Sequence, residues 1–190
     1  MLNKSTRPYL EKIHNEVVHD MKCSRHEIHP MYPSDFASQL SVLSLGEIKD
    51  TIRHLLKIRD KDTWMLFGTL PIYPCIQDED DKALFDALRN AENVSLRNDP
   101  DGRSRLNVNV FTGNVIVTDF GDENGTISNI KTDKLNDVYK QWLNSDLAQS
   151  LNCHCEPYHC LGPNVLVKNM YYPNTDFREN EKMMHRIFQQ

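Results

Sequence analysis

The chain has 190 residues, of which 39% are hydrophobic and 26% charged, so it can bury a core in one large or two small domains. Its formal net charge is −5 and it contains no run of Lys or Arg, so we expect no nucleic-acid partner. It has no apolar stretch as long as a membrane span and no apolar signal segment after Met1. We therefore expect a cytoplasmic protein with no membrane partner.

The first 75 residues alternate between helical and strand patterns, which is typical of parallel α/β architecture. The predicted elements are a helix that begins after Thr6, a strand at 25–28, a helix from residue 45 and a strand at 64–67. Ser44 and Glu47 have the spacing of a capping box, which supports the start of the second helix. Two strands are too few for an independently stable parallel sheet. We therefore expect this region to need other polypeptide, from a partner chain or from a second copy in a homodimer.

The rest of the chain shows the pattern of a small α+β domain, so we expect two domains, 1–75 and 76–190. After a first helix, residues 106–110 alternate between apolar side chains and asparagines, as in a half-buried strand. Gly113 then predicts the turn of a β-hairpin. A later helix is expected to be capped by Thr132 or Asp133.

The five cysteines are the most informative residues for function. Cys153, Cys155 and Cys160 form a C-x-C-x4-C pattern, and thiolates at this spacing can converge on one metal centre. An odd number of cysteines in a reducing compartment argues against a disulfide framework. An iron–sulfur cluster normally needs four thiolates, and Cys75 is the best candidate for the fourth. Cys23 follows a helix and is expected to be a packing thiol.

Zinc is the alternative metal for this pattern. Structural zinc sites favour C-x2-C steps, which differ from the C-x-C step here, but His154 or His159 could complete a Cys3His set. Beside an iron–sulfur cluster, the same two histidines could instead donate hydrogen bonds to cluster sulfur, or simply lie in solvent. The residues alone leave both metals open.

The second half of the chain resembles the accessory domains of radical SAM proteins, which are called SPASM and twitch domains. The resemblance rests on the hairpin at 106–117, the segment at 127–130, the helix with Trp142 and the cysteine-rich end. The C-x-C-x4-C spacing is similar, more closely, to radical SAM/CxCxxxxC proteins of the YfkAB type, whose C-terminal part is the YfkB-like domain. This likeness covers roughly residues 25–172 and is most specific at the three clustered cysteines and at 162–164.

The resemblance implies a fold, a cofactor and a partner. The fold would be the C-terminal strands and helices of a partial radical SAM barrel in 1–75, followed by a small α+β auxiliary-cluster domain with a β-hairpin in 76–190. An auxiliary [4Fe-4S] cluster would be held by Cys153, Cys155, Cys160 and Cys75. The partner would be an N-terminal radical SAM half or an upstream-encoded polypeptide.

Two departures from the family pattern limit what the resemblance implies. Ser128 stands where the broader pattern has Gly, and no C-x3-C-x2-C motif occurs in the chain. In radical SAM enzymes that motif holds the cluster that cleaves S-adenosylmethionine. The chain is therefore expected to be inactive alone and to meet S-adenosylmethionine only together with an N-terminal half. The alternative is a non-enzymatic zinc- or iron–sulfur-binding module for protein interaction.

Further polar residues have two interpretations each. In a partial barrel, His26, Glu27 and His29 could face the reaction chamber, or they could form a solvated strand edge. The segment 31–35 would lie at the C-terminal end of that strand, where barrel active sites are built. Asp119 lies near a position where broader SPASM patterns have a Cys, but it also fits a polar strand end.

Overall fold

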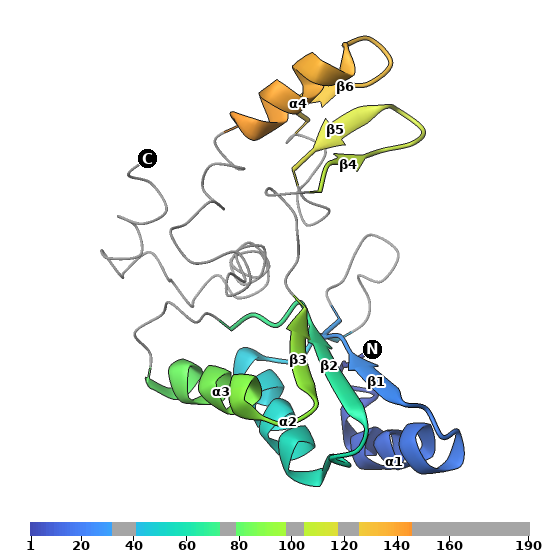
Figure 1. Ribbon diagram of the computed structural model, residues 1–190, viewed down its shortest axis with the longest axis vertical. Coiled ribbons are helices and arrows are strands. Elements are labelled where there is room, and N and C mark those ends of the chain that lie inside the picture. The colour runs from blue at the N-terminus through green and yellow to red at the C-terminus, as the bar shows by residue number, and fades with distance from the viewer. Residues whose placement is uncertain (32–40, 73–78, 98–104, 118–125, 146–190) are drawn as a thin grey trace.

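The computed structural model describes residues 1–31, 41–72, 79–97, 105–117 and 126–145 (Figure 1). The elements in chain order are η1 (Arg7–Tyr9), α1 (Leu10–Asn15), η2 (Glu16–Asp20), β1 (Arg25–Ile28), α2 (Leu45–Ile58), β2 (Trp64–Gly68), α3 (Glu79–Asn90), β3 (Val94–Arg97), β4 (Asn107–Val108), β5 (Asn114–Ile116), β6 (Ser128–Asn129) and α4 (Leu135–Leu143). They build one parallel and one antiparallel sheet. Within the described ranges, no helix has the length and apolar character needed to cross a membrane.

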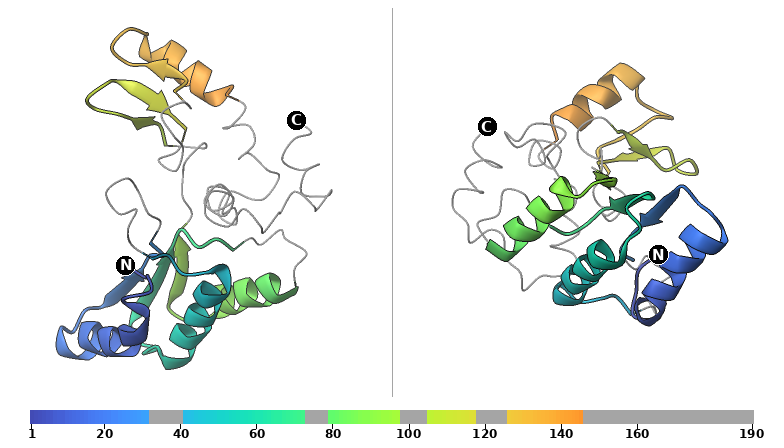
Figure 2. Two further views of the ribbon diagram at one scale, coloured as in Figure 1. Left: turned by 180° about the vertical axis from the view of Figure 1, so that it is seen from behind. Right: turned by 60° about the horizontal axis from the view of Figure 1, so that its bottom comes forward.

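The first sheet contains three parallel strands in the order β1-β2-β3, which is also their order in the chain. Helix α2 connects β1 to β2, and helix α3 connects β2 to β3. Parallel strands joined by helices take right-handed crossovers, so strands added in one direction bring their helices to the same face. Helices α2 and α3 lie side by side and pack on the same core as the strands (Figure 2). This arrangement leaves the other face of the sheet without a helix from these crossovers.

The hydrophobic core lies between this sheet and its helices. Helix α2 begins at the predicted capping box, because the Ser44 side chain accepts from the Glu47 N–H and the Glu47 side chain accepts from the Ser44 N–H. The apolar stripe of α2 is fully buried against the strands, and α3 contributes a second stripe. The main members of this core are Ile28, Ile48, Ile52, Leu55, Met65, Phe67, Leu84, Phe85 and Leu88. Burying one such side chain contributes about 1.5–3 kcal/mol.

The sheet is larger than the sequence predicted. Strand β3 was not anticipated, and it pairs with β2 over four residues, from Met65↔Val94 to Gly68↔Arg97. The first sheet therefore takes in α3 and β3, which lie beyond residue 75. Ile28 and Phe67 are covered by the chain's own helices, at 4% and 1% exposure, and need no other polypeptide to bury them.

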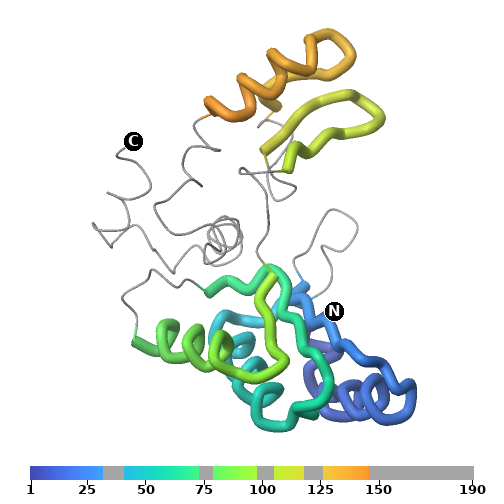
Figure 3. The backbone as a smooth tube through the Cα atoms, viewed as in Figure 1, coloured from blue at the N-terminus to red at the C-terminus, as the bar shows by residue number. Residues whose placement is uncertain are grey.

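The second sheet is an antiparallel arrangement of β4, β5 and β6, followed by α4 (Figure 3). The predicted hairpin turn is confirmed, and Gly113 occupies the left-handed region at φ 81°, where a side chain would also collide with Asn129. The predicted cap of α4 was wrong, because its N-cap is Lys134. Asp133 instead accepts hydrogen bonds from the Ser128 hydroxyl at 2.5 Å and from the Asn129 N–H at 3.1 Å.

Two buried histidines join the N-terminal helix to the first strand. The rings of His14 in α1 and His26 in β1 are stacked, and their Nδ1 atoms lie 3.0 Å apart. The Asp60 N–H donates to His14 Nε2, so neutral His14 carries its proton on Nδ1 and donates it to His26 Nδ1. Burial, followed by the neighbouring His14, lowers the pKa of His26 to about 4. Burial, followed by His19, also lowers the pKa of His14, against an opposing effect of Asp60.

This pair should make the fold sensitive to mild acid. The unfolded chain binds a proton at His26 near pH 6.5, whereas the folded chain does so only near pH 4. The stability that neutral His26 contributes is therefore fully present above about pH 6.5 and is lost as the pH falls from 6.5 toward 4. We expect the free energy of unfolding to drop by about 1–2 kcal/mol between pH 7 and pH 5. Urea denaturation at the two pH values measures it.

The substitution His26→Leu removes the titrating ring and should shrink this pH-dependent loss by more than half. His54→Gln is the control, since His54 is exposed on α2. An unchanged pH dependence in His26→Leu would show that other groups cause the acid sensitivity.

Candidate functional site

The four predicted cluster ligands, Cys75, Cys153, Cys155 and Cys160, lie outside the described residues. The same holds for four other predicted positions, His154, His159, Asp119 and the segment 32–35. Cys23 is described, and it is a half-buried free thiol. Within the part of the chain that the structure describes, no three His, Cys, Asp or Glu side chains are grouped as metal ligands.

The described part of the chain offers a polar site on the face of the first sheet that receives no helix from the described residues. Side chains alternate between the two faces of a strand. His26 and Ile28 point toward the helices, so Arg25, Glu27 and the following His29 point to the other face. The register adds Trp64, Leu66 and Gly68 of β2, with Ser95 and Arg97 of β3. We call these eight residues the helix-free face.

Glu27 and His29 form the centre of this face. The imidazole Nε2 of His29 lies 2.7 Å from Glu27 Oε1. When Nε2 donates to the carboxylate, the neutral ring keeps its lone pair on Nδ1. A strand residue and the second residue after it share one face, which is why two neighbouring polar side chains of β1 can meet in this way.

Gly68 makes room for the His29 ring at the carboxyl end of the central strand. A Cβ atom built on Gly68 would lie 2.2 Å from His29 Cε1 and 2.4 Å from His29 Nδ1. Any side chain at this position would therefore displace the imidazole. The conformation of Gly68 does not require a glycine, so the requirement comes from the space that the ring occupies.

Two arginines from opposite edges of the sheet complete the cluster. Arg25 Nη2 on β1 donates to Glu27 Oε2 at 2.8 Å. Arg97 on β3 reaches across the central strand, and its Nη1 lies 3.5 Å from Glu27 Oε1. The Arg97 side chain thus extends over β2 next to Gly68, which is the register partner of Arg97. A glycine in the middle of the row thus allows side chains of β1 and β3 to approach each other.

The electrostatics of the cluster favour an ionised Glu27. The hydrogen bond from His29 is the largest cause that lowers the pKa of this carboxyl, and the charges of His29 and Arg25 lower it further. One carboxylate then faces two guanidinium groups and the imidazole N–H of His29. The helix-free face therefore carries an excess of positive charge in a chain whose net charge is −5.

The sequence interpretation of these residues was partly wrong. It grouped His26 with Glu27 and His29, but strand alternation sends His26 to the opposite face, where it binds His14. It did not include Gly68 or Arg97 in a site. Arg97 was missed because β3 was missed. A single strand prediction at 94–97 would have supplied the signal.

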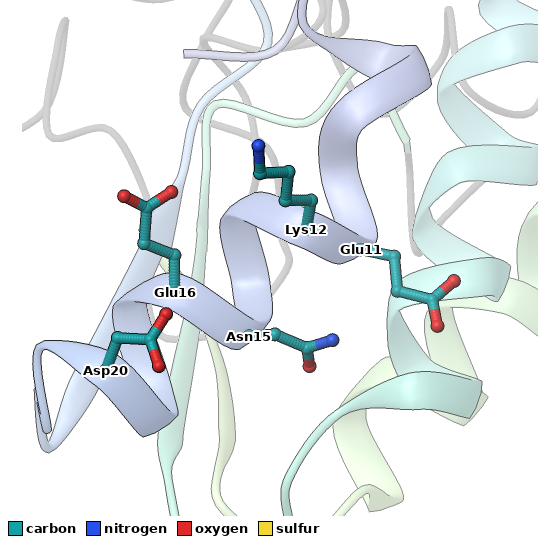
Figure 4. A pocket seen from close by; sticks show the side chains of 5 residues that line it. All are labelled: Glu11, Lys12, Asn15, Glu16 and Asp20. Atoms are coloured by element: carbon teal, nitrogen blue, oxygen red, sulfur yellow. The ribbon is translucent and has the colours of Figure 1, made fainter.

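A shallow surface pocket lies elsewhere, on the outside of the N-terminal helix. It is lined by Glu11, Lys12, Asn15, Glu16 and Asp20 (Figure 4). All five side chains are exposed, and Figure 4 shows that Glu11 and Asn15 extend away from Lys12 and Glu16 rather than toward a common point. The pocket therefore lacks convergent groups, unlike the helix-free face.

Comparisons with known proteins give a family and one curated relative. Residues 31–182 match the family model of YfkB-like domains. The chain is 60% identical over 181 residues to the protein YfkA of Bacillus subtilis (strain 168), and the match covers 95% of this chain and 48% of that protein. The chain thus spans about half the length of this relative. No solved structure matches the chain.

The close approach of Gly68 and His29 can be tested by a double-mutant cycle. Gly68→Ala should destabilise the fold by about 1–3 kcal/mol, because the new methyl group overlaps the His29 ring. In a His29→Ala background the same change should cost much less, giving a coupling energy of at least about 1 kcal/mol. Chemical denaturation measures all four proteins.

Gly46→Ala is the matched control, because a methyl group at Gly46 in α2 meets nothing within 4 Å. It should stabilise the helix by up to about 1 kcal/mol. Equal costs of Gly68→Ala with and without the His29 ring would contradict the steric explanation.

Proposed function

This chain belongs to the family of YfkB-like domains, and from that premise we propose that it is the C-terminal half of a radical SAM protein. The chain spans about half of its relative from Bacillus subtilis, which leaves room in the longer protein for an N-terminal half. The chain contains C-x-C-x4-C but no C-x3-C-x2-C, so the proposed N-terminal half would supply the cluster that cleaves S-adenosylmethionine.

The main support for this proposal is the strand order of the first sheet and the placement of its helices. Consecutive parallel strands in the order β1-β2-β3, with their helices on one face, are the repeating arrangement of a (β/α) barrel. In a barrel the face without helices is the interior, so the helix-free face would line the interior of a completed barrel. The carboxyl ends of the strands, where Gly68 and Arg97 lie, are the ends at which barrel enzymes build their active sites.

The outer edge of β1 supports the need for a second half. The Ser24 carbonyl accepts from the Trp64 N–H on the side of β2, so by alternation the backbone groups of Arg25, Glu27 and His29 point to the outer side. On that side Leu2 forms a parallel bridge with Pro30, and its N–H donates to the His29 carbonyl at 2.7 Å.

Leu2 occupies the place where a parallel strand that enters the first helix would end. Within the described ranges, no strand pairs with the outer edge of β1 at Arg25 and Glu27. A strand that carries unpaired backbone groups on a sheet edge is a template for a further strand. We propose that a strand of the N-terminal half pairs there and extends the barrel.

The proposed cofactor of this half is an auxiliary [4Fe-4S] cluster bound by Cys153, Cys155, Cys160 and Cys75. The donor set fits such a cluster, since four thiolates are its usual ligands and the chain has one cysteine to spare, Cys23. When bound, the cluster would supply an electron-transfer site or a point of substrate attachment. The alternative is a Cys3His zinc site with His154 or His159, in a module that binds proteins without catalysis.

Anaerobic reconstitution with iron and sulfide tests the cofactor. We expect about four irons and four sulfides per chain and a brown protein that absorbs at about 400 nm. Replacing any one of the three clustered cysteines by Ala should abolish assembly. Cys75→Ala should destabilise the cluster, whereas Cys23→Ala, the matched control, should leave the iron content unchanged.

Each other result has a distinct meaning. Stoichiometric zinc, with no uptake of iron under reducing conditions, would contradict the cluster and favour the zinc module. Loss of iron in Cys23→Ala but not in Cys75→Ala would reassign the fourth ligand. Full iron in both would leave a histidine, a substrate or water as the fourth ligand.

Arg25→Pro tests the edge of β1 as the junction between the two halves. Proline removes the outward N–H of this residue and is tolerated at the edge of a sheet. We expect Arg25→Pro to weaken binding of the separately expressed N-terminal half by about tenfold or more, the equivalent of about 1.4 kcal/mol. Arg25→Gln removes the charge but keeps the N–H, and it should bind like the wild type.

Calorimetric titration of the two halves measures this binding. Hydrogen exchange at Arg25 and Glu27 should also slow when the halves combine. Identical binding by the proline and glutamine variants would contradict pairing at this edge.

A further inference from the structure

The helix-free face carries more positive charge than its own carboxylate neutralises. Arg25, Arg97 and His29 all contact the single carboxylate of Glu27, at 2.8, 3.5 and 2.7 Å. Two guanidinium groups against one carboxylate leave an excess of one positive charge. His29 and Arg97 lie at the carboxyl ends of β1 and β3, whereas Arg25 is the first residue of β1.

The arginines retain hydrogen-bond donors that Glu27 does not use. A guanidinium group has five N–H donors in a fixed plane, and one contact with Glu27 involves only one nitrogen on each arginine. Both side chains are 54% exposed, so their remaining donors are accessible. Arginine binds carboxylate and phosphate oxygens in paired hydrogen bonds, which suits these free donors to an anionic ligand.

A cationic ligand fits this face less well. Glu27 is the only acidic side chain among the eight residues of the helix-free face, and its two oxygens already contact three basic groups, as hydrogen bonds with Arg25 and His29 and as an ion pair with Arg97. An ammonium group would have to displace one of these donors and would meet the two arginine charges. The charge balance therefore selects an anion.

We propose that Arg25, Arg97 and His29 bind an anionic group, a carboxylate or a phosphate, of a ligand held against the helix-free face. Glu27 is a positioning residue in this site, because it fixes the three donors without contacting the ligand. This inference deepens the proposed function, since in a completed barrel the ligand would lie in the interior. The binding itself uses only residues of this chain and does not require the cluster.

Nuclear magnetic resonance of the full ¹⁵N-labelled chain tests the site with two probes, sodium phosphate and sodium acetate. Titrations at low ionic strength, with sodium chloride as the control for salt, should move the amide signals of Gly68, Ser95 and Arg97 in a saturable way. The probe that binds more tightly identifies the oxyanion class. Arg97→Gln and Arg25→Gln should each weaken binding by about fivefold, as expected for one half-exposed charge-assisted contact.

Arg53→Gln is the matched control, since Arg53 is a half-exposed arginine that also pairs with carboxylates, but on the helical side at Asp50 and Asp80. It should bind the probes like the wild type. Equal shifts with chloride, or unchanged binding in Arg97→Gln, would mean an adventitious ion only and would overturn the proposal.

The test is independent of the cofactor experiment. Saturable binding by a chain that takes up no iron would contradict the radical SAM half but support the anion site. A chain that assembles its cluster but shows no binding at these residues would overturn the anion site alone.

Discussion

The right-handed crossover between parallel strands is the constraint on which the rest of this structure depends. Because β1, β2 and β3 follow one another in the same direction across the sheet, each crossover brings its helix to the same face. That face holds the apolar stripes of both helices together with one row of apolar side chains from each strand, namely Ile28, Met65, Phe67, Val94 and Leu96. The other face receives no helix from these crossovers, and there the same strands carry Arg25, Glu27 and Arg97.

The two-residue period of a strand then divides β1 between two environments. His26 is buried at 8% exposure beside His14, where burial keeps it neutral. Glu27, the next residue, lies on the opposite face in a cluster of charges. One strand of four residues thus contributes both an uncharged core pair and a charged site. This division explains why His26 is held neutral while Glu27, the next residue in the chain, is held ionised.

Local sequence patterns predicted the elements that depend on local interactions. The capping box of Ser44 and Glu47 and the hairpin turn at Gly113 are set by nearby residues, and the structure confirms them. The strand at Arg25–Ile28 is also confirmed, although its partner β2 lies about 40 positions later in the chain. The cap of α4 failed because Asp133 has the residue type of a cap but is used by Ser128 and Asn129 of the preceding strand. A side chain with two possible partners cannot be assigned from its own neighbours in sequence.

The site required information that a linear pattern does not contain. Strand β3 has four residues, partly buried, and its Val94 and Leu96 are too few to reveal a period of two. Without β3, Arg97 has no place in the sheet. Its contact with Glu27, which lies 70 positions earlier in the chain, then cannot be predicted. Gly68 directly follows the strand predicted at 64–67, but its role depends on the His29 ring, which comes from the neighbouring strand. For the four predicted cluster ligands the situation is reversed. Their spacing in the sequence is informative, but they lie outside the described residues.

The charged cluster is hard to explain by stability alone. Ion pairs between half-exposed side chains are worth about 0–1 kcal/mol, because water competes for each charge. A face built for stability would more simply carry apolar or neutral side chains, as the helical face does. Three basic groups arranged around one carboxylate, with a glycine that admits the His29 ring, instead resemble a preorganised site whose charges gain strength when water is removed. Pairing of a further strand with β1 and closure of a barrel would remove that water, so the open edge and the charged face are two consequences of the same proposed assembly.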